Sequence, residues 1–352
     1  MLKSIEIKNY RGIKNLKIDN FKKYNFFVGD NGSCKTTILE SLFSAFPNSP
    51  EGIITAANSR GLQVNLDNKY NFFFNADEEN KIEFILNDEI VTKINTKNFI
   101  EKNSLDLTNT SISIEAKLSS LMSPKFLYNS LKSYGEKVFL DVDIMIDNIF
   151  NITTNIKNIN NNLLNKYSKI YGSSYFISPS IKYKGNASLV IKELIKNKKK
   201  NELIDILNLF EKDIDDINLD GSQVLLSKKG VKKLLPISSF GGGLSSILDI
   251  VTYLFDDEIK TLFIDEIETG IHYLNYPKFC ESLIKVSKEK DIQLFITTHS
   301  KEILEEFYKI LENTNKDDTC LYRFQKNNDT IKSVHYTKER ALSAIQNNWD
   351  VR

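Results

Sequence analysis

The amino-acid sequence predicts an α/β fold built around a parallel sheet. In the last third of the chain, short apolar runs rich in β-branched residues alternate with helical patterns, which is typical of parallel strands joined by crossover helices. Near the N-terminus another apolar run, at 24–28, precedes a glycine-containing loop and an amphipathic helix over 36–46. The middle of the chain lacks this order, so we expect one large α/β unit that carries an insertion.

The composition is that of an ordinary globular chain. The 352 residues are 41% hydrophobic and 26% charged, and 47 basic against 46 acidic residues give a net charge of +1. This balance argues against a wholly basic nucleic-acid coat, but it leaves a local basic patch open. We see no run of about 18 apolar residues and no apolar leader, and three cysteines without CxxC spacing give no disulfide framework. We therefore expect a cytoplasmic protein without a membrane partner.

The N-terminal part of the chain predicts several strands. Residues 2–8 alternate like a half-buried strand, a turn follows at Arg11–Gly12, and further strands are expected at 15–18 and 24–28. The run at 24–28 is apolar except for Asn25, which indicates a position at the centre of a sheet. Residues 70–96 predict two or three more strands.

The middle of the chain predicts a mostly helical insertion at 98–175. Helical patterns cover 125–135 and 143–170, without the sustained heptads of a long coiled coil. Two amphipathic helices are expected within 187–214, and the basic run at 198–200 between them is interpreted as a solvated helix end. The expected division of the chain is a first lobe at 1–97, the insertion at 98–175 and a second lobe at 176–352.

The C-terminal third predicts alternating strands and helices and then a closing hairpin. The strands are expected at 261–265, 292–298, 319–325 and 331–336, and the helices at 244–255, 274–289, 300–312 and 337–346.

The loop after the strand at 24–28 carries a phosphate-binding pattern. Between a buried strand and an amphipathic helix, backbone N–H groups of such a loop form a cradle for anions. Lys35 would supply a charge for the β- and γ-phosphates, and the Thr36 hydroxyl would be a Mg²⁺ ligand. Cys34 stands where the pattern has glycine, so its side chain would crowd the loop or strain the backbone. The residues expected to bind nucleotide here are Gly29, Asn31, Gly32, Ser33, Cys34, Lys35, Thr36 and Thr37.

A second pattern is the apolar strand that ends in Asp265 and Glu266. Asp265 would hold Mg²⁺ through its water shell together with Thr36, and Glu266 would polarise the attacking water as a catalytic residue. Acidic pairs after strands are common, so this pattern gains its weight from the phosphate-binding loop upstream.

Two further motifs complete the set. His299 ends the next predicted strand, 34 residues after Asp265, where a histidine would contact the γ-phosphate and assist catalysis. His272 is either part of a loop that faces a second subunit or an ordinary polar loop residue. Ser239 and the glycines Gly241, Gly242 and Gly243 open a helix, and they either bind phosphate or simply cap that helix. One phosphate loop and one separate glycine-rich helix start fit a dimer in which each subunit completes the other's site.

In this order, the segments RGIKNLKI, GDNGSCKTT, SSFGGG, LFIDEIETGIH and FITTHS resemble the ABC-type ATPase heads of the RecF/SMC/OLD group. The resemblance covers about the first 95 and the last 175 residues, and it is closest to the compact AAA-family ATPase subunits of anti-phage systems such as PARIS and Septu. It implies an ABC-type P-loop ATPase head with mixed sheets flanked by helices. Lys35 and Thr36 match the Walker A pair, Asp265 and Glu266 match the Walker B pair, Ser239–Gly243 match the signature loop, and His299 matches the switch histidine. The Q-loop has no clear match, and Gln63 is a weak candidate for it.

The resemblance also implies a function. We expect ATP hydrolysis with Mg²⁺, slowed by Cys34, in a homodimer or higher oligomer that acts as a sensor or switch in anti-phage defence. About 50 residues follow His299, so we expect any nuclease or toxin effector to be a separate chain. The alternatives are a RecF-like DNA-repair ATPase that binds duplex DNA and a structural subunit with little turnover. Near-neutral charge and few arginines favour the first hypothesis over dedicated DNA binding, although a nucleic-acid partner stays open.

Overall fold

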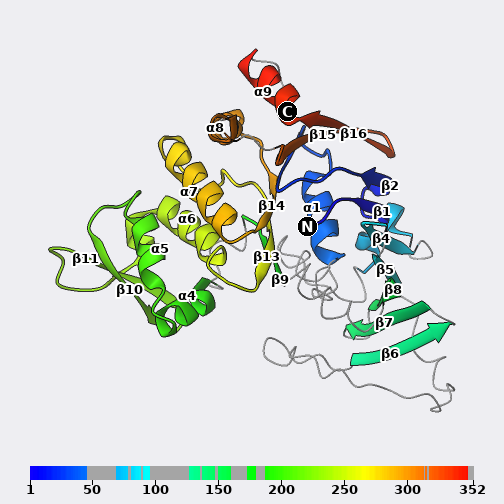
Figure 1. Ribbon diagram of the computed structural model, residues 1–352, viewed down its shortest axis with the longest axis horizontal. Coiled ribbons are helices and arrows are strands. Elements are labelled where there is room, and N and C mark those ends of the chain that lie inside the picture. The colour runs from blue at the N-terminus through cyan, green and yellow to red at the C-terminus, as the bar shows by residue number, and fades with distance from the viewer. Residues whose placement is uncertain are drawn as a thin grey trace.

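A six-stranded sheet forms the centre of the computed structural model (Figure 1), in the order β16-β15-β3-β14-β13-β9. Strand β3 runs parallel to both of its neighbours, β13 lies parallel to β14 and β9, and β16 closes an antiparallel hairpin with β15. The bounds are β3 Tyr24–Gly29, β9 Ser173–Ile177, β13 Ile259–Ile264, β14 Gln293–Thr297, β15 Thr319–Asn327 and β16 Thr330–Thr337. The structure describes residues 1–45, 69–77, 81–88, 90–95, 127–134, 137–146, 150–159, 173–179, 187–312, 314 and 317–347.

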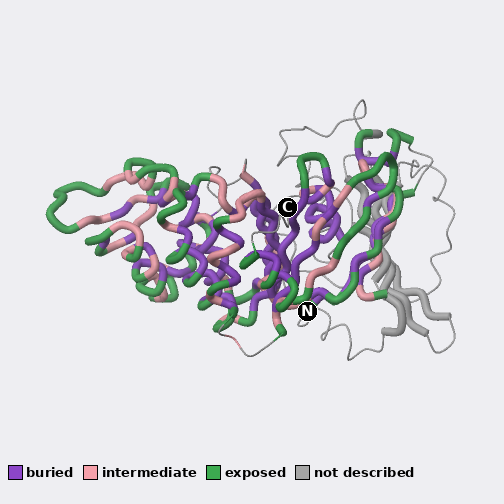
Figure 2. Tube along the Cα trace, turned by 90° about the horizontal axis from the view of Figure 1, so that it is seen from above, coloured by how far each residue is buried: buried purple, intermediate pink, exposed green. Residues whose placement is uncertain are grey.

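The two faces of this sheet are covered by two separate apolar cores. Phe27 and Phe295 belong to the core that contains α1 (Lys35–Ser44), whereas their neighbours Phe26 and Leu294 belong to the core that contains the C-terminal helices. Successive side chains of a strand point to opposite faces, so a strand covered on both faces is mostly apolar. Buried segments accordingly run through the middle of the molecule (Figure 2).

The second core is covered by helices that follow the central strands in the chain. Three further strands form a small antiparallel sheet, whose strand β10 packs beside α5. The helices are α4 Ala187–Lys196, α5 Lys200–Leu207, α6 Gly242–Tyr253, α7 Tyr276–Glu289, α8 Lys301–Glu312 and α9 Lys338–Gln346, and the small sheet contains β10 Ile214–Asp220, β11 Gln223–Lys228 and β12 Leu235–Pro236. Within the ranges that the structure describes, no helix has both the length and the apolar character needed to cross a bilayer.

A seven-stranded antiparallel sheet, ordered β2-β1-β4-β5-β8-β7-β6, contributes its first strands to the core around α1. Its strands are β1 Ile5–Tyr10, β2 Ile13–Ile18, β4 Ile82–Leu86, β5 Ile90–Asn95, β6 Leu127–Tyr134, β7 Lys137–Ile146 and β8 Phe150–Ile159.

This sheet corrects the prediction of a mostly helical insertion. Helices were expected at 125–135 and 143–170, but the described residues there form the strands β6, β7 and β8. The backbone register pairs Leu127 with Ile144 and Leu131 with Leu140, so the segment extends the antiparallel sheet. The boundaries of the three expected regions remain a prediction.

One smaller expectation is also wrong. A strand was expected for the segment NKYNFFF at 68–74, but the described residues form the short 3₁₀ turns η1 (Lys69–Phe72) and η2 (Phe74–Ala76), and Asn75 and Ala76 have positive φ angles of 56° and 55°. The basic run at 198–200 lies at the start of α5, where Lys198 is exposed, Lys199 pairs with Asp257 at 2.7 Å and Lys200 pairs with Asp216.

Candidate nucleotide-binding site

The loop between β3 and α1 takes its shape from the strand next to it. Gly29 has a φ of 142°, and a Cβ at this position would lie 2.3 Å from the carbonyl oxygen of Phe324 on β15. No other residue fits there without displacing the backbone of β15. The loop therefore starts where β3 and β15 come closest together.

Cys34 occupies a left-handed backbone conformation with φ 69° and ψ 19°, directly before α1. An L-residue pays a conformational cost in this region that glycine avoids, so the expected backbone strain is present. The thiol lies 3.7 Å from the Gly32 carbonyl oxygen and beside the β1–β2 turn, where a Cβ on Gly12 would be 3.3 Å from the sulfur.

Lys35 folds its ammonium group back into the loop. Its Nζ donates to the carbonyl oxygens of Gly29 at 2.8 Å and Asp30 at 3.1 Å, and it lies 3.5 Å from the Ser33 hydroxyl. Burial lowers the pKa of Lys35, and the charge of Asp265 opposes this effect. Among the described residues its hydrogen-bond partners are neutral oxygens, which a cation can exchange for phosphate oxygens.

Three adjacent strands bring Thr36, Asp265 and Thr297 together. Strand β14 lies between β3 and β13, so the Thr297 hydroxyl reaches Asp265 from one side and the Thr36 hydroxyl reaches it from the other. Asp265 Oδ1 accepts a hydrogen bond of 3.0 Å from Thr36 and one of 2.6 Å from Thr297. Burial raises the pKa of Asp265 to about 6 although both hydroxyl bonds lower it.

These residues fit Mg²⁺. A hydroxyl and a carboxylate are hard oxygen ligands, and a buried carboxylate with a raised pKa is one that an added positive charge would stabilise. The described residues contain no group of three or more His, Cys, Asp or Glu that could enclose a metal ion. Mg²⁺ commonly binds in this way, through one or two protein oxygens plus phosphate and water.

Glu266 stands in a strained position directly after this carboxylate. Its φ is 46°, its N–H donates to Thr297 Oγ1 at 2.8 Å, and its carboxylate accepts a 3.2 Å hydrogen bond from the Thr269 hydroxyl. Such strain in a non-glycine residue persists only where neighbours hold it, and it concentrates at functional sites. Thr297 thus positions both acids, a role that the sequence analysis did not assign.

His299 lies in the loop after β14, and Glu268 holds that loop. One carboxylate oxygen of Glu268 accepts the His299 N–H at 2.7 Å, and the other accepts the Thr298 hydroxyl at 2.7 Å. Sequence reasoning missed Glu268. The available signal was a third acid in the loop that follows Asp265 and Glu266.

The glycine-rich segment is exposed at the start of α6. Gly241 has a φ of 90°, a Cβ on Gly242 would meet no atom within 4 Å, and one on Gly243 would lie 3.3 Å from the Gly270 carbonyl oxygen. Ser239, in η4 (Ile237–Phe240), is also exposed. Helices α1 and α6 pack on opposite faces of the central sheet (Figure 1). The structure therefore does not unite the two phosphate-binding candidates on one face of a single chain.

His272 caps the short 3₁₀ turn η5 (Tyr273–Asn275), since its ring nitrogen accepts the Leu274 N–H at 3.4 Å. The next two side chains, Tyr273 and Leu274, are 62% and 68% exposed. Gln63, the Q-loop candidate, lies outside the described residues.

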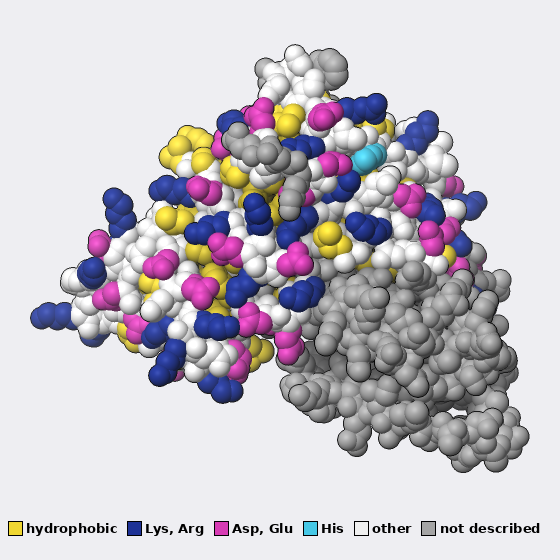
Figure 3. Space-filling model, in the orientation of Figure 1, with side chains coloured by type: hydrophobic (Ala, Val, Ile, Leu, Met, Phe, Trp, Pro, Cys, Tyr) yellow, Lys and Arg dark blue, Asp and Glu magenta, His cyan; other side chains and the backbone are white. Residues whose placement is uncertain are grey.

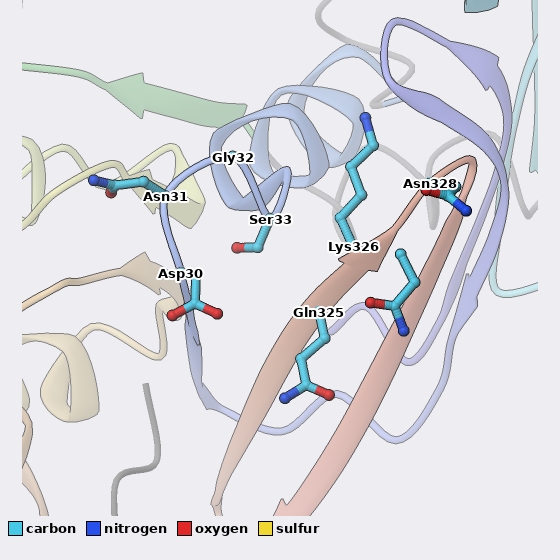
Figure 4. A pocket seen from close by; sticks show the side chains of 8 residues that line it. Asp30, Asn31, Gly32, Ser33, Gln325, Lys326 and Asn328 are labelled. Carbon is cyan, nitrogen blue, oxygen red and sulfur yellow. The ribbon is translucent and has the colours of Figure 1, made fainter.

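A hollow of about 490 Å³ lies beside the phosphate loop (Figure 4). It is bordered by Asp30–Ser33 on one side and by Gln325–Asn328, at the tip of the β15–β16 hairpin, on the other. The space next to the phosphate loop is thus polar and large enough for part of a nucleotide.

The model of the AAA_15 family, the AAA ATPase domain, matches residues 1–304. The chain belongs to this family. An ATP/GTP phosphatase of Helicobacter pylori is 28% identical to this AAA_15 ATPase over 325 residues, which are 87% of each chain. An SMC head bound to the C-terminal winged-helix domain of ScpA has a similar fold, with a TM-score of 0.56, 12% identity and coverage of 97% of this chain and 99% of the other. The fold predicted from the motifs, a mixed α/β ATPase head of the ABC/SMC type, is confirmed.

Proposed function

We propose that this AAA_15 ATPase binds ATP with Mg²⁺ at the loop of residues 29–37 and hydrolyses it between two copies of the chain. The contact of Thr36 and Thr297 with the buried carboxylate of Asp265 carries the proposal, because it joins a hydroxyl of the phosphate loop to an acid two strands away. The phosphatase name of the Helicobacter pylori relative supports hydrolysis of a nucleoside triphosphate.

Each residue has a chemical task in this proposal. Lys35 exchanges its carbonyl partners for phosphate oxygens, and Thr36 and Asp265 hold the metal ion, which neutralises phosphate charge when bound. Glu266 orients the attacking water and takes its proton, and His299 contacts the γ-phosphate. The two acids need little rearrangement for this, since Thr297 already holds both of them in place.

A second copy would complete the site through the start of α6. The first N–H groups of α6, at Gly242 and Gly243, present the positive end of a helix, and within one chain this helix covers the face of the sheet opposite α1. Supplied by the partner, these groups would replace water around the γ-phosphate and stabilise the charge that develops in the transition state.

The hydrolysis test is Glu266→Gln. The amide keeps the size of the side chain but cannot take a proton from water, so we expect ATP binding to be retained and turnover to be abolished. Binding is measured by calorimetry and turnover by phosphate release, with Glu281→Ala, an exposed carboxylate on α7, as the control. Unchanged turnover in Glu266→Gln would refute the assignment.

We further propose that ATP turnover drives a switch subunit of an anti-phage system with a separate effector protein. The likeness of the motifs to compact AAA-family subunits of anti-phage systems supports this assignment, and the near-neutral net charge of +1 favours it over RecF-like DNA repair. In addition, Figure 3 shows lysines interspersed with acidic side chains on the described part of one face, where a duplex DNA track would need a continuous basic stripe.

This cellular role is tested by phage challenge of cells that carry the gene with its neighbours. Protection that is lost in Lys35→Ala, together with a neighbouring nuclease or toxin gene, is the expected result. Replication genes as neighbours, no protection and ATP-dependent binding of duplex DNA would instead favour the repair ATPase.

A further inference from the structure

Glu268 connects the two loops that carry the proposed catalytic residues Glu266 and His299. It lies two residues after Glu266, and both of its carboxylate oxygens are engaged by the loop after β14, at 2.7 Å from the His299 nitrogen and 2.7 Å from the Thr298 hydroxyl. Short hydrogen bonds to an ionised acceptor are among the stronger ones in proteins. Glu268 thus fixes the backbone from which the His299 ring projects.

A chain of hydrogen bonds through the Thr298 hydroxyl connects Glu268 to the start of α8. It donates to Glu268 and accepts the Ser300 N–H at 3.0 Å, and the Ser300 hydroxyl in turn accepts the Ile303 N–H at 3.2 Å in the first turn of the helix. One carboxylate of the neighbouring loop is therefore linked by hydrogen bonds to the first turn of α8. Thr298 is almost fully buried, so water competes little for these bonds.

The loop of Glu268 also contacts the start of α6. Gly270, two residues further on, presents its carbonyl oxygen to Gly243 so closely that a Cβ there would lie 3.3 Å away. The same short loop thus touches the histidine that serves the chain's own nucleotide and the glycines that would serve the partner's nucleotide.

We infer that Glu268 is a positioning residue for ATP hydrolysis, which holds His299 against the γ-phosphate and ties it to the loop of Glu266. The inference rests on the proposed function of this site. Glu268 itself does not touch the nucleotide, and its effect on the reaction passes through His299.

The first test compares Glu268→Ala with Glu268→Gln. Alanine removes both acceptors, and because a misplacement of about 1 Å can cost 10²-fold in rate, we expect kcat to fall by about 10- to 100-fold. ATP affinity and KM should stay within about threefold, since Lys35 and Thr36 are untouched. Glutamine can accept the His299 N–H and donate to Thr298 Oγ1, so kcat should return to within about threefold of the wild-type value.

The second test is a double-mutant cycle between Glu268→Ala and His299→Ala, with Glu281→Ala as the matched control. If Glu268 acts through His299, the double variant will be no slower than His299→Ala alone. Rate losses that multiply, a wild-type kcat in Glu268→Ala, or an equal loss in Glu268→Gln and Glu268→Ala would overturn the inference.

The two tests separate this inference from the proposed function. Normal turnover in His299→Ala or in Glu266→Gln would refute the proposed site itself, whatever Glu268 does. If Glu268→Ala does not fold, Thr298→Val removes one of the two contacts and Thr298→Ser keeps it. A kcat that falls in the valine variant and survives in the serine variant supports the inference, and equal kcat values in the two overturn it.

Discussion

The buried carboxylate of Asp265 lowers the stability of the folded chain when it is ionised. Its pKa, raised to about 6 by burial, lies above the value of 3.8 for a free aspartate, so ionisation destabilises the folded chain. The cost grows as the pH rises from about 4 to 6 and is complete above that range. A shift of about two pH units corresponds to about 3 kcal/mol.

We predict that Asp265→Asn stabilises the protein in the absence of Mg²⁺ and nucleotide while abolishing turnover. The asparagine oxygen can still accept the Thr36 and Thr297 hydroxyls, but it carries no charge. The gain in the free energy of unfolding, measured by denaturant titration, should approach about 3 kcal/mol at pH 8 and be much smaller at pH 4.5. Equal gains at both pH values would contradict the assigned cause.

Cys34 is a second residue that lowers the stability of the folded chain, here through its backbone conformation. Its left-handed backbone, with φ 69°, suits glycine, so we predict that Cys34→Gly stabilises the chain by about 1 kcal/mol and leaves or raises ATP affinity and turnover. Cys34→Val serves as the opposite control, because a β-branched side chain tolerates positive φ poorly. A large loss of turnover in Cys34→Gly would show instead that the thiol itself has a function.

At the level of elements, the β15–β16 hairpin buries part of the titratable ring of His335, which disfavours its protonated form. The ring of His335 lies 5.0 Å from that of Tyr322, and among the described residues its buried Nε2 has no hydrogen-bond partner. Burial is the main cause that lowers the pKa of His335, and repulsion from Lys22 adds to it. The folded hairpin therefore prefers the neutral ring.

We predict that His335 makes the protein less stable as the pH falls. A folded pKa below the unfolded value of about 6.5 means that the unfolded chain binds the proton more readily, so stability is full above that pH and is lost as the pH falls below it. His335→Phe keeps a ring beside Tyr322 and cannot titrate. The difference in unfolding midpoint between variant and wild type should therefore grow in favour of the variant from pH 7.5 to pH 5.5, and a constant difference would contradict the prediction.

The sequence predicts an element well when the spacing of its apolar residues fits either a helix or a strand but not both. Strand β3 is buried throughout, is apolar except for Asn25 and is followed by a glycine loop, and the mostly apolar strands β13 and β14 alternate with helical patterns. The strands of the insertion were missed because the spacing of their apolar residues fits both a helix and a strand. Leu127 and Leu131 are four residues apart, as are Ile152 and Ile156, and this spacing places two residues on one side of a helix and also on one face of a strand. The alternation of Val138, Leu140, Val142, Ile144 and Ile146 on β7 was the signal that favours a strand.

The site was predictable where residues share a motif and not where they meet only in space. Lys35, Thr36 and Asp265 follow from strand–loop patterns, and the structure brings them together. Glu268 acquires its place only because β13 and β14 end side by side, which no local pattern encodes.

For the whole molecule, the proposed partner arrangement gives a test by mixing. A Cβ on Gly242 meets no atom within 4 Å in its own chain, so Gly242→Trp should fold and bind ATP normally while it blocks the partner's site. Gly242→Trp and Lys35→Ala should each be inactive alone. A mixed dimer has one intact site, so an equal mixture should recover up to about a quarter of wild-type turnover, measured by phosphate release.

Gly242→Ala is the control for this experiment, because its small side chain leaves the surface nearly unchanged. Normal turnover by Gly242→Trp alone would contradict the arrangement in trans. No recovery in a mixture shown to contain mixed dimers would contradict two independently acting sites.

The position of β3 in the central sheet also decides when this protein becomes active during its synthesis. The strand leaves the ribosome among the first residues, yet both of its neighbours, β14 and β15, are translated near the end. The backbone of β15 presses against Gly29, so a nascent chain that has not reached Phe324 lacks one wall of its phosphate loop. Contacts between such distant parts of a chain form late. We therefore expect chains that stop before β15 to lack a complete phosphate loop, and full-length chains to be the ones that bind nucleotide.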